Sequence, residues 1–355
     1  MSMLLHKAAY AMDHKEYWRS EKVAFLALCS LKGVGFSTLH KWAVAQVSFK
    51  EVLRYPARFG IERLLDHTDV DLEMVQSVTW QKGLELARKL SAMNARVIFK
   101  NEPGFPERLR NIPSAPEWIF VQGNLDNLYT PTVGVVGTRK PSDDGLFLTR
   151  ILVSAMCNIP IATVSGLASG IDQLAHIESL RCHIPTVAVL GTGIFDNYPK
   201  GSELLRRGIV ESGGTILTEY LPYQSYSADN FVRRNRLQAA LSDFLVPIEW
   251  KVKSGTAHTV RFARSYGKKL VAVRLPYALH HTQELDYIRD ECGGFDFVLP
   301  QEAERLGDII SAVIESHSEC RSHIVSEPIE LDVSSPDAQD STEQTVSNDP
   351  QLPLI

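Results

Sequence analysis

Three glycine-rich segments carry the residue types that could hold a phosphate group. They lie at 134–142, 165–172 and 191–193, and each follows an apolar run. Glycine lets a backbone N–H approach an anion closely, and a helix that begins at such a turn adds the positive end of its dipole. Arg139 and Lys140 place two cations in the first segment, and Lys200 follows the third. Together the three turns indicate an anion site, whereas one such turn alone is equally typical of an ordinary α/β fold.

A second concentration of cations lies at 229–236. Arg233, Arg234 and Arg236 fall within four residues, next to the aromatic ring of Phe231. Arginine contacts phosphate through two N–H groups at once and also stacks on bases. Phe231 could stack on an unpaired base. A charge run is more often a solvated helix face, however, and a phenylalanine is more often core, so this segment on its own is not specific.

Four residues could instead carry acid–base catalysis, namely Asp172, His176, Glu219 and Glu249. They could equally have structural roles: Asp172 can cap a helix, His176 can pack on a helix face, and Glu249 can pair with a loop arginine. The sequence has no GxxxxGK(S/T) loop and no GxGxxG followed by an acidic residue about 20 positions on. Its five cysteines show no CxxC and no zinc spacing with histidine. We therefore expect a binding protein without metal or cofactor, not an enzyme.

The charge of the chain is unevenly distributed. The net charge is −5, but ten Lys or Arg face only two acids between 231 and 274, whereas eight acids face one arginine from 318 to 355. A basic segment of this kind favours a polyanionic partner. No apolar run reaches the roughly 20 residues of a membrane span, and the first 19 residues lack the apolar stretch of a secretion signal. The expected location is the cytoplasm.

The elements that must position these segments follow from the apolar pattern. Residues 20–100 are predicted to be helical, with two short helices around a tight turn at 33–35, and 96–99 to be a short strand. Apolar runs rich in β-branched residues follow at 133–136, 161–164, 186–190, 215–217, 244–248 and 270–273. Such strands alternating with helices are typical of a parallel sheet covered on both faces. Pro247 inside the fifth run conflicts with this, because proline prefers edges and bulges.

The predicted fold class is α/β, an extended Rossmann-like doubly wound parallel sheet with a small helical N-terminal domain and a disordered acidic C-terminal tail. The domains are expected at 1–100, 101–310 and 311–355, with closing structure at 286–309. The tail is rich in Ser, Asp, Glu, Gln and Pro, so it cannot bury enough apolar surface to offset its chain entropy.

Short motifs in a fixed order identify what the α/β part resembles. They lie at 137–141, 165–172 with 175–176, 191–193 with 198–199, and 231–236, followed by Glu249, Ser254, Gly255 and Thr259. These resemble the GSR-x-P, SGLARGID with AH, GTG with YP, FPRRNR and late elements of the DprA/Smf family of DNA-processing proteins. The resemblance runs from 105 to 275, and the helical N-terminus around 33–35 also resembles the family's helix-hairpin-helix or SAM-like region. The chain departs from the family pattern at Ser169, Tyr223, Val232 and Arg274, and it lacks the C-terminal winged helix of some members.

The resemblance implies a Rossmann-fold homodimer that binds and protects single-stranded DNA. It further implies loading of a RecA-type recombinase during recombination and during the uptake of transforming DNA in competent cells. By position it assigns the DNA and phosphate site to Gly137, Thr138, Arg139, Lys140, Ser165, Gly166, Lys200, Phe231, Arg233, Arg234, Asn235, Arg236, Ser254 and Gly255.

Two other functions remain open from the sequence. One is a nucleotide-sensing or nucleoside-monophosphate-cleaving protein of the lysine-decarboxylase-like, phosphoribohydrolase class, such as one that acts in phage defence. That class carries a PGGxGTxxE motif, and here Thr259 stands at the position of its glutamate, which disfavours hydrolysis. The other is an adaptor whose acidic tail mimics DNA or occupies the protein's own basic groove.

Overall fold

The computed structural model describes residues 2–61, 63, 72–278 and 281–322. Residues up to Ser311 form one compact unit, and a second unit begins at Ala312. Within the described residues of the first unit, the strands form one sheet in the order β1-β2-β6-β5-β4-β3-β7-β8-β9. The strands are β1 (Ala95–Phe99), β2 (Trp118–Gly123), β3 (Thr132–Gly137), β4 (Ala162–Ser165), β5 (Thr186–Val189), β6 (Thr215–Thr218), β7 (Phe244–Ile248), β8 (Lys269–Arg274) and β9 (Phe295–Val298).

The apolar runs account for most of this sheet. All six runs predicted in the α/β part are strands, β3 to β8, and they pair in parallel. Every residue of β4, β5, β6 and β7 is buried, as a sheet covered on both faces requires. The predicted strand at 96–99 is β1, which pairs antiparallel with β2, and β2 pairs antiparallel with β6. The doubly wound α/β fold is confirmed, while β2 and β9 were not predicted.

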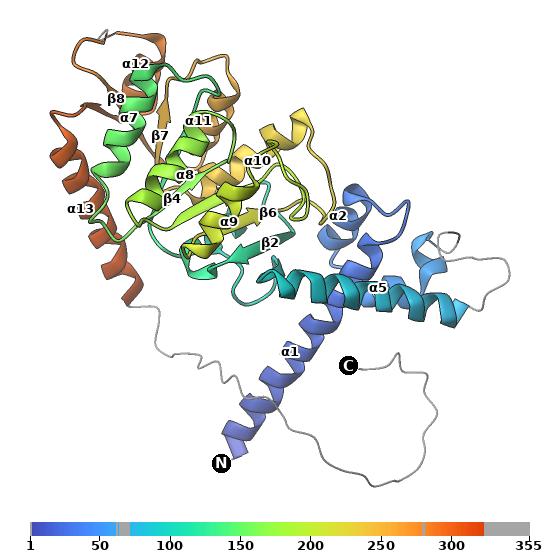
Figure 1. Cartoon of the computed structure of the whole chain (residues 1–355). Helices are drawn as coiled ribbons and strands as arrows, with labels where there is room; N and C mark the ends of the chain where they lie inside the picture. Colours follow the sequence, from blue (N-terminus) through green and yellow to red (C-terminus); the bar gives the residue numbers. More distant parts are fainter. Residues whose placement is uncertain (1, 62, 64–71, 279–280, 323–355) are drawn as a thin grey trace. The chain divides into compact units, whose positions relative to one another are not determined.

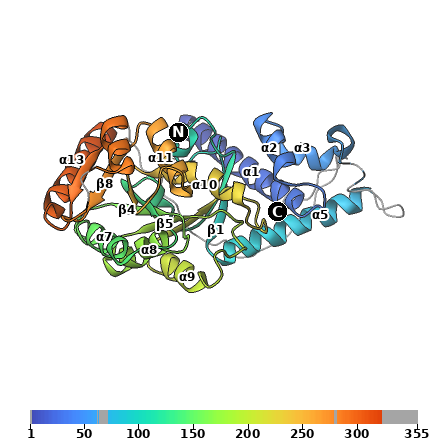
Figure 2. The same cartoon turned by 90° about the horizontal axis from the view of Figure 1, so that it is seen from above.

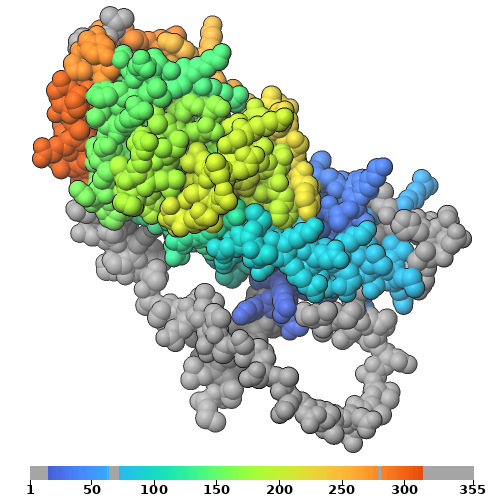
Figure 3. Space-filling view, in the orientation of Figure 1, coloured from blue at the N-terminus to red at the C-terminus, as the bar shows by residue number. Residues whose placement is uncertain are grey.

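Helices cover both faces of the sheet (Figures 1 and 2). On one face lie α7 (Asp143–Ser154), α8 (Ile171–Arg181) and α9 (Glu203–Glu211); on the other lie α10 (Ala228–Leu241) and α11 (Gly255–Ser265). Figure 3 shows α7 to α9, green to yellow-green, covering the first face. The loops that join each parallel strand to the following helix therefore lie together at the carboxyl ends of the strands.

Pro247 occupies an inner strand without conflict. Its strand β7 lies between β3 and β8, but β7 and β8 pair only at Phe244 and Leu245. At Pro247 the strand therefore has a single paired neighbour, β3. The missing N–H of proline is tolerated there for the same reason that it is tolerated on an edge.

The N-terminal region is helical, as predicted for 20–100. Its helices are α1 (Ser2–Cys29), α2 (Phe36–Val44), α3 (Phe49–Arg54), η1 (Pro56–Phe59) and α5 (Leu72–Ala92). The helix before the 33–35 turn is not short, since α1 has 28 residues. Phe25 of α1 packs on Trp118 and Phe120 of β2, with ring centroids 4.9 and 6.2 Å apart. These helices thus share one apolar cluster with the edge of the sheet.

The remaining elements connect and close the domain. They are α6 (Glu107–Arg110), η2 (Leu125–Leu128), α12 (Gln283–Asp286), η3 (Tyr287–Glu291) and α13 (Ala303–Ser322). Helix α13 runs across the predicted boundary at 311, and the predicted tail from 323 onward lies outside the described residues. The division at 100 and 310 stays a prediction. In the described part of the chain, no helix combines the length and apolarity needed to cross a bilayer.

Candidate functional site

The sheet has a reversal point at β3, and a cavity opens there. From β3 the chain adds β4, β5 and β6 on one side, and it then returns to place β7 on the other side of β3. Open α/β sheets bind ligands in the crevice outside the carboxyl ends of the strands at such a reversal. The cavity there has a volume of about 640 Å³ and is lined by the turn after β3, the start of α8, the first half of α10 and the β7–α11 connection.

Many of the predicted site residues line this cavity. Those that do are Gly137, Thr138, Arg139, Phe231, Arg234, Asn235, Ser254 and Gly255. They come from three separate stretches of the chain, so the prediction that the glycine turn and the 231–236 segment converge agrees with the geometry. Lys140, Ser165, Gly166, Lys200, Arg233 and Arg236 do not line it.

The turn after β3 is built by close backbone packing. A Cβ on Gly137 would overlap the carbonyl of Ile248, and one on Gly170 would overlap the carbonyl of Thr138. Gly170 also has φ = 89°, which favours glycine. This packing brings the start of α8 next to the turn and leaves Arg139 exposed, with its guanidinium carbon 5.4 Å from the centre of the Phe231 ring. A cation and an aromatic face therefore share one wall of the cavity.

The arginines of α10 do not act together, which corrects the sequence-based prediction. Arg236 is buried, and its guanidinium donates to both carboxylate oxygens of Glu219 at 2.6 and 2.7 Å. Arg233 lies 4.7 Å from the centre of the Phe36 ring in α2, outside the cavity. Positions 233 and 236 lie three residues apart on one face of α10, so Arg233 also approaches Glu219, with its Nε atom 3.6 Å from Oε1, whereas Arg234 points in another direction. Of the three, Arg234 lines the cavity, and Arg236 stabilises the fold.

Arg234 is held below the cavity by the neighbouring strand ends. Its Nη1 donates to the carbonyl of Gly166 at 2.6 Å and to that of Val189, and a Cβ on Gly166 would overlap this guanidinium. Burial lowers the pKa of Arg234 to about 10, so the group stays charged at neutral pH. Gly166 and Ser165 therefore contribute by holding Arg234 and the strand ends, since Ser165 is buried and donates to the Val135 carbonyl.

Asp172 is a buried carboxylate at the base of the cavity. It accepts hydrogen bonds from the backbone N–H groups of Gly137 at 3.3 Å and Gly166 at 3.1 Å, and so ties two glycine turns together. Burial raises its pKa to about 6, and the nearby Arg234 opposes that rise. The expectation that Asp172 caps its own helix is wrong, because no side chain caps α8.

The pKa of Asp172 predicts a pH dependence of anion binding. A phosphate in the cavity is repelled by the carboxylate and not by the carboxylic acid, so affinity should rise as the pH falls through about 6. With a pKa of about 6, the protonated fraction grows up to about 25-fold between pH 7.5 and 5.5, which bounds the gain in affinity. Titration of labelled oligo-dT at both pH values measures it. Asp172→Asn should abolish the dependence; an unchanged pH profile in that variant would contradict the assignment.

The other candidate catalysts are engaged within the protein. The Nδ1 atom of His176 lies 2.7 Å from the Thr186 hydroxyl, and burial lowers the pKa of His176 to about 3. Glu249 accepts hydrogen bonds from the backbone N–H, at 2.8 Å, and the hydroxyl of Ser142, which joins the end of β7 to the start of α7. Glu249 therefore contacts a serine where an arginine was expected. Ser142 caps α7, as its position after the first glycine turn suggests.

Several cavity residues were not identified from the sequence as binding residues. Tyr226, Trp250, Lys251 and Thr256 line the cavity, although only the glycines and cations near them were noticed. The signal that could have found Trp250 and Lys251 is their place directly after β7, the strand across the reversal from β3. Lys140 and Lys200 are exposed in loops near this end of the sheet.

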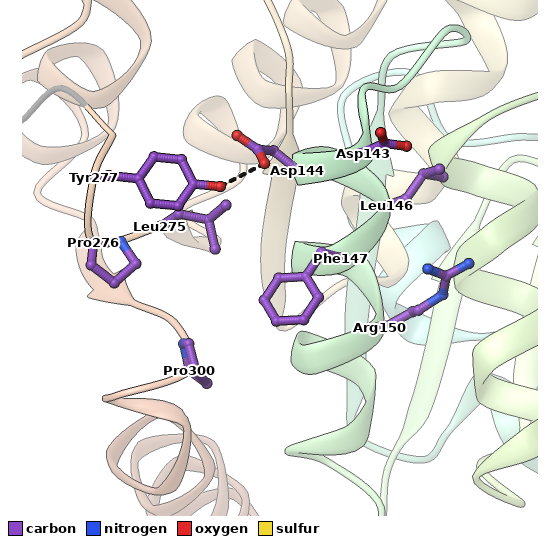
Figure 4. Close-up of a pocket in the computed structure, with 9 residues that line it drawn as sticks. All are labelled: Asp143, Asp144, Leu146, Phe147, Arg150, Leu275, Pro276, Tyr277 and Pro300. Carbon is purple, nitrogen blue, oxygen red and sulfur yellow. Dashed lines mark hydrogen bonds between the residues drawn. The ribbon is translucent and has the colours of Figure 1, made fainter.

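A second, separate depression of about 560 Å³ lies between α7 and the segment after β8 (Figure 4). Tyr277 donates a hydrogen bond to Asp144 at 2.6 Å across it, and Phe147 faces the same space. Asp143 and Asp144 make its rim acidic. It shares no lining residue with the cavity at the reversal point.

Comparison with known proteins assigns the chain to a family. The family model described as DNA recombination-mediator protein A matches residues 96–285, more than half of the chain. The chain belongs to the DprA/Smf family. The matched range contains the whole cavity, β2 to β8 and all of β1 except Ala95.

Curated DprA/Smf proteins show the same relationship. Protein Smf of Synechocystis is 31% identical over 72% of this chain and 65% of its own length. DNA processing protein DprA of Streptococcus pneumoniae is 35% identical over 48% of this chain and 59% of its own length. The matches thus span about half to two thirds of these relatives.

Solved DprA structures share the fold. That of DNA processing protein A from Streptococcus pneumoniae superimposes with a TM-score of 0.54 at 25% identity, covering 80% of this chain and 96% of that one. DNA processing protein A from Helicobacter pylori, solved for its single-stranded DNA binding mode, gives a TM-score of 0.54 at 23% identity over 64% of this chain and 98% of its own.

Proposed function

We propose that the chain binds single-stranded DNA in the cavity at the reversal point and acts as a DNA-processing mediator in recombination, without catalysis. The observation that carries the proposal is the wall formed by Arg139 and Phe231, where a cation for phosphate lies against an aromatic ring for a base. Glu219 and His176 are buried and engaged within the protein, which leaves them without a free role in chemistry. Glu249 lines the cavity, and its carboxylate binds Ser142 at the start of α7.

The names of the relatives support the same direction. Several are DNA processing proteins, and the Helicobacter pylori relative binds single-stranded DNA. Loading of a RecA-type recombinase, assembly as a homodimer and a role in transformation belong to this proposal as its further parts.

Salt dependence tests the proposal at the level of charge. Among the exposed cations on or beside the cavity are these three: Arg139, Lys140 and Lys251. If each neutralises one phosphate, a single-strand slope of about −0.7 per phosphate gives roughly a 20-fold loss of affinity for a fourfold rise in salt. Fluorescence anisotropy of labelled oligo-dT measures this slope. An affinity independent of salt would contradict phosphate contacts.

Competition distinguishes DNA binding from the nucleotide-directed alternative. Unlabelled nucleoside monophosphates are added to the same titration, and the products are analysed by chromatography. We expect neither turnover nor displacement of the oligonucleotide at comparable concentrations. Cleavage of the nucleotide would favour a phosphoribohydrolase, and displacement without cleavage would favour a nucleotide sensor.

A further inference from the structure

Two loops next to the cavity are joined into one rigid surface. The loop after β5 and the loop after β6 exchange backbone hydrogen bonds, from the Gly193 N–H to the Gln224 carbonyl at 2.7 Å and from the Phe195 N–H to the Pro222 carbonyl at 2.9 Å. A Cβ on Gly193 would overlap the carbonyls of Leu221 and Pro222. The first loop is further fixed by Arg206, which donates to the carbonyls of Asp196 and Ile194 at 2.7 and 2.9 Å.

These joined loops carry two exposed tyrosines, each supported by a second aromatic ring. Tyr223 is 64% exposed and stacks on Phe195, with ring centroids 4.9 Å apart and planes at 29°. Tyr226 is 54% exposed and lies 4.2 Å from the ring of Tyr198. Tyr198 in turn lies 5.0 Å from the ring of Phe231. We call Tyr223 and Tyr226 with their supporting rings the aromatic ridge.

The ridge is continuous with the cavity. Tyr226 and Phe231 both line the cavity, and the Arg139 guanidinium lies over the Phe231 ring. Lys200, in the same loop as Phe195 and Tyr198, is exposed. A strand that leaves the Arg139 wall therefore meets Tyr226 at the cavity, and the same pair of joined loops carries Tyr223 and Lys200.

The chemistry of the ridge matches unpaired bases. Aromatic rings held in place by a second ring lose little conformational freedom when a flat partner stacks on them, and every base offers such a face. Bases in a duplex are already stacked and paired, so a ridge of this kind selects single strands. Its hydroxyls are not required for stacking.

We propose that the aromatic ridge stacks successive unpaired bases of a strand whose phosphates enter the cavity, and so extends the binding site beyond the phosphate contacts. This inference rests on the proposed function. It assigns to Tyr223 and Tyr226 a role in affinity for bases, separate from that of Arg139 for phosphates.

Two probes of equal length test it: labelled oligo-dT, and a labelled strand with abasic sites throughout, which keeps every phosphate and lacks every base. The full chain is expected to bind oligo-dT roughly 150-fold more tightly than the abasic strand, at about 5-fold for each base stacked on Tyr223, Tyr226 and Phe231. The variant Tyr223→Ala with Tyr226→Ala should reduce that difference to the about 5-fold part that Phe231 supplies, by weakening oligo-dT binding alone. The variant Tyr223→Phe with Tyr226→Phe should bind both probes like the unchanged protein.

The control is Tyr277→Ala, because Tyr277 is 73% exposed and lies at the acidic second depression (Figure 4). It should leave the affinity for both probes unchanged. Equal affinity of the unchanged protein for oligo-dT and the abasic strand would overturn the ridge, as would oligo-dT binding that survives loss of both tyrosines. If the unchanged protein bound neither probe, the proposed function itself would fail.

Discussion

Replacing Glu219 by alanine is expected to lower the free energy of unfolding by about 3–5 kcal/mol, because it leaves a buried guanidinium without its carboxylate. Glu219 follows β6 and is 1% exposed. It accepts from both Nη atoms of Arg236, which otherwise donates to the carbonyls of Ser114 at 2.8 Å and Arg233 at 3.1 Å. Those two neutral partners cannot balance a buried charge. Urea unfolding followed by circular dichroism measures the change.

An exposed ion pair gives the matched control. Glu291 lies 3.1 Å from Arg264, and both side chains are about half exposed. Glu291→Ala should leave the unfolding midpoint almost unchanged, because water solvates the arginine that remains. A Glu219→Ala midpoint that moved as little as that of Glu291→Ala would show that the buried pair does not stabilise the fold as argued.

A paired substitution separates stability from DNA binding at Arg236. Glu219→Leu combined with Arg236→Met replaces both charges with apolar groups of similar size, which should restore most of the stability lost in Glu219→Ala. We expect this variant to keep its affinity for oligo-dT, because Arg236 does not face the cavity. If the double variant were stably folded but had lost its affinity for oligo-dT, Arg236 would contact phosphate, as the sequence suggested.

The sequence predicted the sheet well because its strands are apolar throughout. The runs that became β3 to β8 need no partner information, since burial on both faces leaves a continuous β-branched pattern. Strand β2 begins with such a run at 118–121 and was therefore predictable on the same ground, whereas the half-buried β9 lacks one. Strand β9 joins the sheet because of its neighbour β8, and this long-range pairing is invisible in a local pattern.

The parts of the site that are formed by backbone turns were predictable, and the contacts of its side chains were not. The glycine turns after β3 and β4 had to lie close together, because parallel strands have their carboxyl ends on the same side of a sheet. Which arginine of 233–236 lies at these strand ends depends on Glu219, which binds Arg236 and directly follows β6. Tyr226 contacts Tyr198 because the loop after β6 is hydrogen-bonded to the loop after β5, and no spacing in the sequence predicts that pairing.

Replacing Arg139 by alanine should weaken oligo-dT binding by about 10- to 150-fold, the loss expected when a charged hydrogen bond to phosphate is removed. The variant should also flatten the salt slope by about 0.7, since one phosphate contact is gone. Oligo-dT, oligo-dA and oligo-dC should be affected alike, because backbone contacts carry no sequence code. Arg139→Lys should bind with intermediate affinity, since lysine keeps the charge but cannot make the two parallel hydrogen bonds of a guanidinium to phosphate.

The control for Arg139 is Arg181, an exposed arginine at the last turn of α8. Helix α8 begins beside the cavity and runs away from it, so Arg181 lies toward the amino ends of the parallel strands. Arg181→Ala lowers the net charge by the same amount and should leave both the affinity and the salt slope unchanged. If the two alanine variants lost affinity equally, binding would depend on the overall charge of the protein, and the cavity would not be the binding site for the strand.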